Sequence, residues 1–279
     1  MAITGGIKFF DESLCEDGTA SSAVSGDASS ANLLDANRET FFRTVSSSDS
    51  IVETITITFA EDKIIDRLFI VDTNLKDFNI KYDVSGVWTH FASVVDIDAN
   101  RTNVTRTDYA KDTYYAEFTQ VTTGAIQITA NTTQVVDAEK YINQVIVTAE
   151  LNTLVGYPDI RGVKANRGNK VKRTISNKYS VQKSLEGFEY NLSMKNYPTQ
   201  AVYSVDIDAI IALHDREEPF IAWLCGGRTG SPHFGYQLRG FRIRDVVKMQ
   251  MTSPLNLSYS SNIYNNPANV GSIKLVEHI

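Results

Sequence analysis

The chain has 279 residues, with 27 Lys+Arg and 33 Asp+Glu, which give a formal net charge of −6 at pH 7. A hydrophobic content of 42% and a charged content of 22% exclude a disordered or fibrous protein and suit one large or two ordinary globular domains. No apolar run approaches the roughly 20 residues of a membrane-spanning helix. Residues 1–10 lack the basic segment and apolar core of a signal peptide, so we expect no membrane partner.

Charge is distributed unevenly along the chain. Up to Val155 there are 11 Lys+Arg and 23 Asp+Glu, and from Gly156 onward there are 16 and 10. A proline at 158 and a change in composition place a domain boundary here. We therefore predict an arm (1–20), a first domain (21–155) and a second domain (156–279). The opposite net charges of the two domains favour head-to-tail contacts between copies of the chain. The alternative is that the surface charges of the two domains drifted separately and have no role in assembly.

The two cysteines, Cys15 and Cys225, lie far apart in the sequence. Disulfide scaffolds need several cysteines at close spacing. Both residues are therefore predicted to be reduced and to act as small apolar side chains.

Strand patterns begin at residue 51. Ile51, Ile55, Ile57 and Phe59 alternate with polar residues at the two-residue period of a half-buried strand. After a turn at 60–63, further strands are expected at 64–71, 77–82, 113–118, 125–130 and 141–151. Turns every 8–12 residues are typical of a β-sandwich.

Several pieces of this region resemble the discoidin domain, the factor 5/8 type C or galactose-binding-like family. The stretch LDANRETFF at 34–42 is similar to that family's "LDGN-x-x-T-x-W" turn. The strands at 53–59, 64–70, 114–118, 125–128 and 142–147 follow in the family's order, so that the resemblance covers about 23–151. The sequence departs from the family at three positions, which are Ala36 for glycine, Phe42 for tryptophan and Gln144 for glutamate.

The resemblance implies a jelly-roll sandwich that binds glycans or lipids through variable loops without a fixed motif. Trp88 and Tyr109 are the candidate glycan contacts, because exposed aromatic rings would provide a platform. Thr40 and Phe41 are predicted to belong to the turn and the core. An acidic loop with Asp35 and Asp27 could hold calcium through carboxylate and carbonyl oxygens. No dense run of alternating carboxylates supports such a site, so we predict no metal or cofactor.

Residues 160–185 are basic and contain no acidic residue. A strand expected at 171–181 has basic residues on one face, which favours a long charged hairpin that meets an acidic partner surface. Phosphate binding is the alternative, but the aromatic residues and recognition-helix pattern of nucleic-acid binders are missing. The candidate inter-subunit contacts here and in the later strand are Lys170, Lys172, Arg173, Lys178, Arg242 and Arg244.

The rest of the second domain reads as a strand, one helix and several strands. The helix is expected to begin at Ser204 and end before Pro219. This helix leading into a strand at 220–224, together with the later strand at 240–245, resembles bacteriophage tail-tube and tail-hub proteins. That resemblance implies a small sandwich with one flanking helix and an extended hairpin, which assembles into rings.

No catalytic motif is present in the sequence. It contains no nucleophile elbow, no zinc-protease motif and no dinucleotide-binding glycine pattern, so we predict that the protein is not an enzyme. His233 is the best single candidate for a functional side chain, although a structural role is favoured. His214 and Asp215 are predicted to be polar residues at the surface rather than a catalytic pair, because adjacent residues on a helix point in different directions.

The strand patterns predict a mainly β protein, and the resemblance to phage tail proteins implies a virion structural protein in a tail or hub. Copies would form a ring with other tail proteins after assembly in the host cytoplasm, and the first domain would face outward to neighbours or to cell-surface glycan. The alternative is a carbohydrate-binding module of a cellular protein. A glycan-acting enzyme is a third hypothesis.

Overall fold

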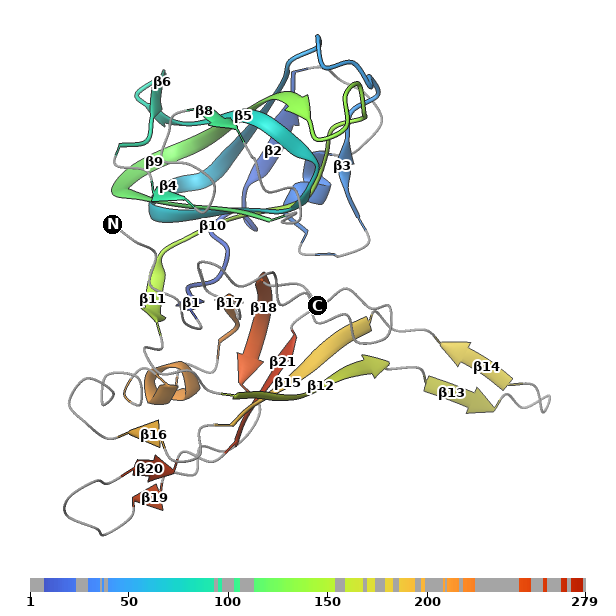
Figure 1. Cartoon of the computed structure of the whole chain (residues 1–279), viewed down its shortest axis with the longest axis vertical. Coiled ribbons are helices and arrows are strands. Elements are labelled where there is room, and N and C mark those ends of the chain that lie inside the picture. Colours follow the sequence, from blue (N-terminus) through green and yellow to red (C-terminus); the bar gives the residue numbers. More distant parts are fainter. Residues whose placement is uncertain are drawn as a thin grey trace.

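The structure of the chain is a computed structural model. It describes residues 8–23, 30–35, 37, 40–92, 95–96, 103–105, 113–153, 159–167, 170–173, 179–182, 186–193, 197–198, 208, 210–215, 218–223, 246–251, 258–259, 267–269 and 272–277. Its two large sheets are antiparallel throughout, so the prediction of a mainly β protein is confirmed (Figure 1). No helix in the described part of the chain is long and apolar enough to cross a membrane.

The first sheet has nine strands and curls into the sandwich drawn at the top of Figure 1. Its main path is β3-β10-β4-β9-β5-β6, and β2, β7 and β8 pair with β4, β9 and β5. The strands are β2 (Thr19–Ser22), β3 (Phe42–Arg43), β4 (Glu53–Thr73), β5 (Leu75–Val84), β6 (Val87–His90), β7 (Val95–Asp96), β8 (Asn103–Thr105), β9 (Tyr114–Thr133) and β10 (Tyr141–Thr148), and the 3-10 helix η1 spans Ser30–Leu33.

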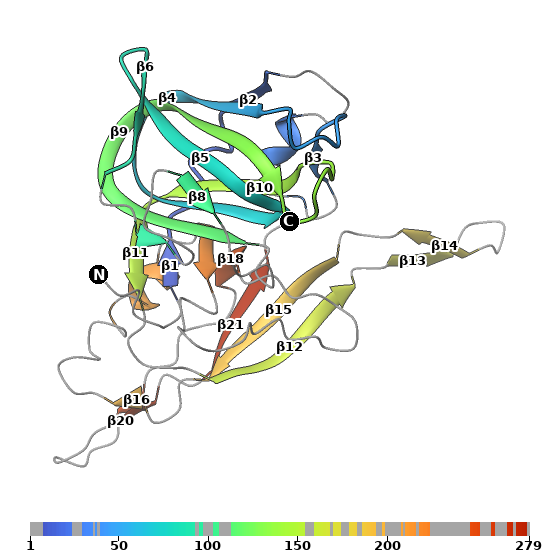
Figure 2. The same cartoon turned by 45° about the horizontal axis from the view of Figure 1, so that its top comes forward.

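Two strands are longer than the sequence patterns predicted. Residues 60–63 were expected to form a turn, but β4 passes through them without ending. β4 and β9 pair along most of their length, with register shifts between Thr58 and Lys63 and between Ile65 and Arg67. The polar residues therefore mark irregularities at which a paired ribbon bends, and Figure 2 shows the curvature of β9.

The core of the sandwich follows the predicted alternation from Ile55 onward, but the predicted inward position of Ile51 is wrong, because Ile51 is 40% exposed and precedes β4. Ile55, Ile57 and Phe59 are 0%, 0% and 5% exposed, and they belong to one cluster with the other inward-facing residues. The predicted core position of Phe41 is wrong, because Phe42 is buried while Phe41 is only half-buried. Cys15 is a free, buried cysteine, as predicted, and burial raises the pKa of its thiol to about 12.

The second sheet has seven strands in the order β11-β1-β17-β18-β21-β15-β12. Its strands are β1 (Lys8–Phe10), β11 (Glu150–Thr153), β12 (Asp159–Arg167), β15 (Glu186–Ser193), β17 (Phe220–Trp223), β18 (Val246–Met251) and β21 (Ser272–Glu277). The N-terminal strand β1 thus lies between β11 and β17, among strands from the other end of the chain. The division of the chain into three predicted parts stays a prediction.

Smaller elements accompany the second sheet. β13 (Lys170–Arg173) pairs with β14 (Tyr179–Gln182), and β20 (Pro267–Asn269) pairs with both β16 (Tyr197–Pro198) and β19 (Ser258–Tyr259). The single strand expected at 171–181 is therefore a hairpin, because residues 170–173 pair back onto 179–182. Residues 210–215 are helical, within the predicted helix.

A second apolar cluster joins the sandwich to β1 and β17. Phe69 and Tyr115, on the outer face of the sandwich, pack with Phe10 and Trp223, and all four side chains are nearly inaccessible. The ring centroids of Tyr115 and Trp223 are 4.5 Å apart, and those of Phe10 and Phe69 are 5.1 Å apart. Residues 68–71 of β4 are consequently buried on both faces of the sheet, which explains their continuous apolar run.

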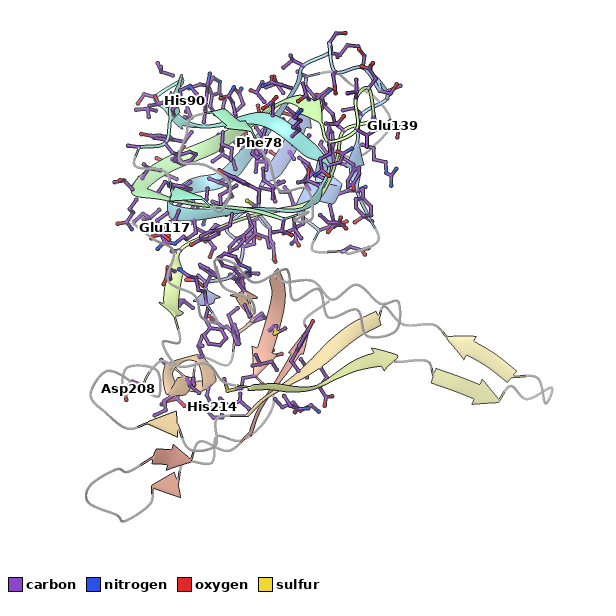
Figure 3. All side chains as sticks on the ribbon, in the orientation of Figure 1. Phe78, His90, Glu117, Glu139, Asp208 and His214 are labelled. Carbon is purple, nitrogen blue, oxygen red and sulfur yellow. The ribbon has the colours of Figure 1, made fainter. Side chains whose placement is uncertain are left out.

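Charged side chains border this cluster. Arg67 Nη2 lies 2.7 Å from Glu150 Oε2 and 3.4 Å from Glu117 Oε1, and Lys8 Nζ lies 3.6 Å from Glu150 Oε2. Burial raises the pKa of Tyr115, so that its hydroxyl stays protonated and donates to Glu117 Oε2 at 3.2 Å. Figure 3 places Glu117 on the side of the sandwich that faces β1. Salt bridges and aromatic packing therefore tie β1 to the sandwich.

Replacing Phe10 with alanine tests this junction. The change removes a fully buried ring that contacts Phe69 and Tyr115, so we expect the free energy of unfolding to fall by about 3–5 kcal/mol in chemical denaturation. Val135→Ala is the control, because Val135 is 70% exposed and should change stability by less than about 0.5 kcal/mol. Equal stabilities of the two variants would contradict the packing described here.

Candidate ligand-binding surface

Two aromatic rings and one arginine gather where β3 meets the start of β10. Phe41 precedes β3, Tyr141 opens β10, and their ring centroids are 5.8 Å apart at an interplanar angle of 85°. The guanidinium carbon of Arg43 lies 5.4 Å from the Phe41 centroid and 5.8 Å from that of Tyr141. Both rings are half-buried, so each keeps part of its surface open to solvent. We call Phe41, Arg43, Glu139 and Tyr141 the edge cluster.

Glu139 supplies the negative charge of the edge cluster. Its Oε2 lies 4.0 Å from Arg43 Nη1, and the two side chains are 54% and 56% exposed. An ion pair this exposed contributes little to stability. Figure 3 shows Glu139 at the outer margin of the sandwich beside β3. The cluster therefore presents carboxylate oxygens and guanidinium N–H groups next to aromatic faces.

The backbone under Tyr141 is fixed by neighbouring side chains. Asn74 Oδ1 accepts the Tyr141 N–H at 2.9 Å, and Asn74 Nδ2 donates to the Glu139 carbonyl at 2.7 Å. Thr73 Oγ1 donates to the Tyr141 carbonyl at 2.8 Å. On the other side, Thr44 N–H and Oγ1 bond the main chain of Lys140. Both flanks of the edge cluster are thus held in place before any ligand arrives.

Lys140 ties the loop after β3 to β10. Its side chain is 2% exposed, and its Nζ donates to the carbonyl oxygens of Ser48 at 3.2 Å and Ile51 at 2.9 Å. Asp49 Oδ1 accepts from both the N–H and the Oγ1 of Thr133, each at 3.1 Å. Just before β10 begins, Lys140 is buried while Glu139 is exposed and Tyr141 is half-buried, so the ammonium serves the interior and its two neighbours reach the surface.

Of the two predicted glycan contacts, the structure describes Trp88, which lies elsewhere. Trp88 is half-exposed on β6, opposite Asp83 of β5. β6 and β3 are the two ends of the strand path, and Figures 1 and 2 both place them on opposite sides of the sandwich. Trp88 therefore does not join the edge cluster, and Tyr109 lies outside the described residues.

The other predicted residues are placed only in part. Lys170, Lys172 and Arg173 lie on β13 of the β13–β14 hairpin. Lys178, Arg242, Arg244 and His233 lie outside the described residues. His214 Nδ1 lies 3.1 Å from Asp215 Oδ1, with the side chains 36% and 70% exposed, so the pair is at the surface but does interact. Figure 3 shows His214 on the helix of the lower part, far from Glu139.

Sequence reasoning missed the edge cluster. Its residues come from 41–43 and 139–141, and only the pairing of β3 with β10 brings these stretches together. The sequence predicts Phe41 in the core and Tyr141 within the strand expected at 141–151. The useful signal was the pair of adjacent phenylalanines at 41 and 42, because side chains of consecutive strand residues point to opposite faces.

Among the described residues, no three His, Cys, Asp or Glu side chains gather in a way that could hold a metal ion. Of the two carboxylates considered for calcium, Asp35 is exposed in the turn and Asp27 lies outside the described residues.

No protein-family model matches the chain, and no curated protein matches it in sequence. Among solved structures, the chain is similar to the family 32 carbohydrate-binding module from C. perfringens NanJ in complex with galactose, with a TM-score of 0.40, 16% identity, and coverage of 51% of this chain and 98% of that one. It is also similar to CpGH89CBM32-5 from Clostridium perfringens, in complex with GalNAc-β-1,3-galactose, with a TM-score of 0.40 and 10% identity; the match covers 49% of this chain and 99% of that one. A third similar structure is a Ruminococcus gnavus GH29 fucosidase in complex with fucose, with a TM-score of 0.39 and 17% identity; the match covers 50% of this chain and 26% of that one. The chain thus spans about a quarter of that fucosidase and almost all of the two modules.

Replacing Lys140 with methionine tests how the edge cluster is supported. Methionine fills similar space but removes the ammonium that donates to the Ile51 carbonyl, and it leaves the Ser48 carbonyl with the Ile51 N–H as donor, so we expect the free energy of unfolding to fall by about 1–3 kcal/mol. Lys63→Met is the control, since Lys63 pairs only with the exposed Glu61 and should change stability by less than about 0.5 kcal/mol. A Lys140→Met protein as stable as the control would show that the loop does not depend on this ammonium.

Proposed function

We propose that the sandwich binds a carbohydrate at the edge cluster, and that it binds the ligand without cleaving it. The observation that carries the proposal is the meeting of two half-exposed aromatic rings with an exposed arginine–glutamate pair. The discoidin resemblance in the sequence implies the same class of ligand but not the place where it binds.

The chemistry of the edge cluster suits a sugar ring. A pyranose has a C–H face that packs on an aromatic ring, and hydroxyl groups around its rim that both donate and accept hydrogen bonds. Phe41 and Tyr141 offer apolar faces, Glu139 accepts hydrogen bonds, and Arg43 donates them.

Rigidity supports the proposal as well. Asn74 and Thr73 fix the backbone of Tyr141, and paired main-chain bonds join Thr44 to Lys140. A surface ordered in advance loses less conformational entropy when a ligand binds. Weak, specific binding of a single terminal sugar is the expected outcome, because one platform contacts only one ring.

The test is a glycan array followed by calorimetry on the full chain. Galactose and GalNAc-β-1,3-galactose, the ligands named in two of the similar structures, are the first probes. Tyr141→Ala and Phe41→Ala should each weaken binding at least about tenfold, equivalent to about 1.4 kcal/mol. Glu139→Gln should weaken it less, because the amide keeps one acceptor.

Trp88→Ala is the matched control, since Trp88 is a half-exposed aromatic at the opposite edge. It should leave affinity within about twofold of the wild type. Loss of binding in Trp88→Ala with full binding in Tyr141→Ala would move the site to the β5–β6 hairpin. The proposal would be wrong if the wild type bound no glycan but captured a partner protein, and if Tyr141→Ala abolished that capture. The ligand of the edge cluster would then be a protein.

The predicted place in a virion tail remains a prediction. One observation favours assembly with other chains: β12 is a nine-residue strand at one edge of its sheet, and among the described strands it pairs with β15 alone. An open edge can pair with a strand of another copy. Rings of the purified protein in electron micrographs are what this second function requires.

A further inference from the structure

A side-chain amide stands at the centre of the turn that leads into β3. Asn143 of β10 is 0% exposed. Its Nδ2 donates to the main-chain oxygens of Asn37 at 3.1 Å and Thr40 at 2.5 Å. Because both partners are carbonyl oxygens, only a donor can bridge them, and this identifies the nitrogen side of the amide. One amide thus joins two segments that lie about a hundred residues apart in the chain.

Other oxygen atoms of the same turn lie close by. Thr40 Oγ1 is 3.0 and 2.8 Å from the two carboxylate oxygens of Asp35, and 3.2 Å from the Asn37 carbonyl oxygen. The Asn37 N–H donates to Asp35 Oδ1 at 2.9 Å. Among its described residues, the turn therefore brings together one carboxylate, one hydroxyl and two main-chain carbonyls. These are the oxygen ligands that Ca²⁺ takes, six to eight at a time, at about 2.3–2.6 Å.

The native turn does not fit a calcium ion. The two carbonyls accept N–H groups of Asn143, and the carboxylate accepts the Thr40 hydroxyl and a main-chain N–H. A neutral amide places partial positive charge where those carbonyls converge, and it supplies no negative charge to balance a divalent cation. We propose that Asn143 takes the place of a cation in this turn, so that the turn closes without metal, and that Asn143→Asp alone converts it into a Ca²⁺ site.

The turn leads directly into the edge cluster. Phe41 follows Thr40, whose carbonyl Asn143 holds, and Tyr141 lies two residues before Asn143 on the same strand. Asn143 is therefore a positioning residue for Phe41, which joins Tyr141 in the edge cluster. The consequence for ligand binding rests on the proposed function: glycan binding at the edge cluster should be independent of calcium.

The first experiment compares melting temperatures of the full chain in EDTA and in millimolar CaCl₂. The wild type should melt at the same temperature in both. Asn143→Asp should melt lower in EDTA, because its carboxylate faces two carbonyl oxygens, and calcium should raise its melting temperature by at least about 3 °C. Asn143→Ala should be destabilised equally in both buffers. Adding Asp35→Asn to Asn143→Asp should abolish the calcium response.

Two outcomes would overturn the proposal. One is calcium binding by the wild type, seen in a direct titration or as a calcium-dependent rise in melting temperature; this measurement needs no variant. The other is an Asn143→Asp protein that calcium does not stabilise, whether it folds in EDTA or fails to fold in both buffers.

A glycan titration separates this inference from the proposed function. Equal affinity of the wild type for glycan in EDTA and in calcium supports the inference, and loss of binding in EDTA overturns it. Absence of glycan binding in both buffers contradicts the proposed function, while the melting experiment still decides the role of Asn143.

Discussion

The buried amide of Asn143 is the contact that places the turn before β3, and with it the Phe41 and Arg43 half of the candidate surface. It holds the carbonyls of Asn37 and Thr40 against β10, and so fixes where the chain enters β3. Phe41 and Arg43 follow at once, and they meet Tyr141 because β3 pairs with the start of β10. A hydrogen-bonded amide buried in a low-dielectric interior is costly to break, since both carbonyls would lose their partner. Hydrogen bonds within the turn and the pairing of β3 with β10 therefore make this part of the surface rigid.

The second organising feature is the place of the N-terminal strand β1 in the seven-stranded sheet. β1 completes that sheet between β11 and β17, and Phe10 on β1 also packs against the outer face of the sandwich. Lys8 and Arg67 neutralise the carboxylates of Glu117 and Glu150 beside it. The junction lies on the β4–β9 face of the sandwich, whereas the edge cluster lies at β3, so a ligand on the edge cluster leaves the junction free.

Periodicity predicted much of the fold and little of the site. The alternation of Ile55, Ile57 and Phe59 gave the core face of β4, and the strands at 77–82 and 141–151 were expected close to where β5, β10 and β11 lie. The turn at 60–63 was misassigned because polar residues inside a bent, paired strand look like a break. The edge cluster was missed because it depends on a contact between residues 41–43 and 139–141, which local patterns cannot show. Trp88 was chosen because of its residue type, and the strand order places it at the opposite edge.

Amide NMR of the isotope-labelled full chain, titrated with the best-binding glycan, tests the central claim most directly. Binding at the edge cluster predicts that the largest shift changes fall in residues 40–43 and 139–141, with those of the β5–β6 hairpin unchanged. Saturable changes centred on residues 83–90, or no saturable change with any glycan, would contradict the account.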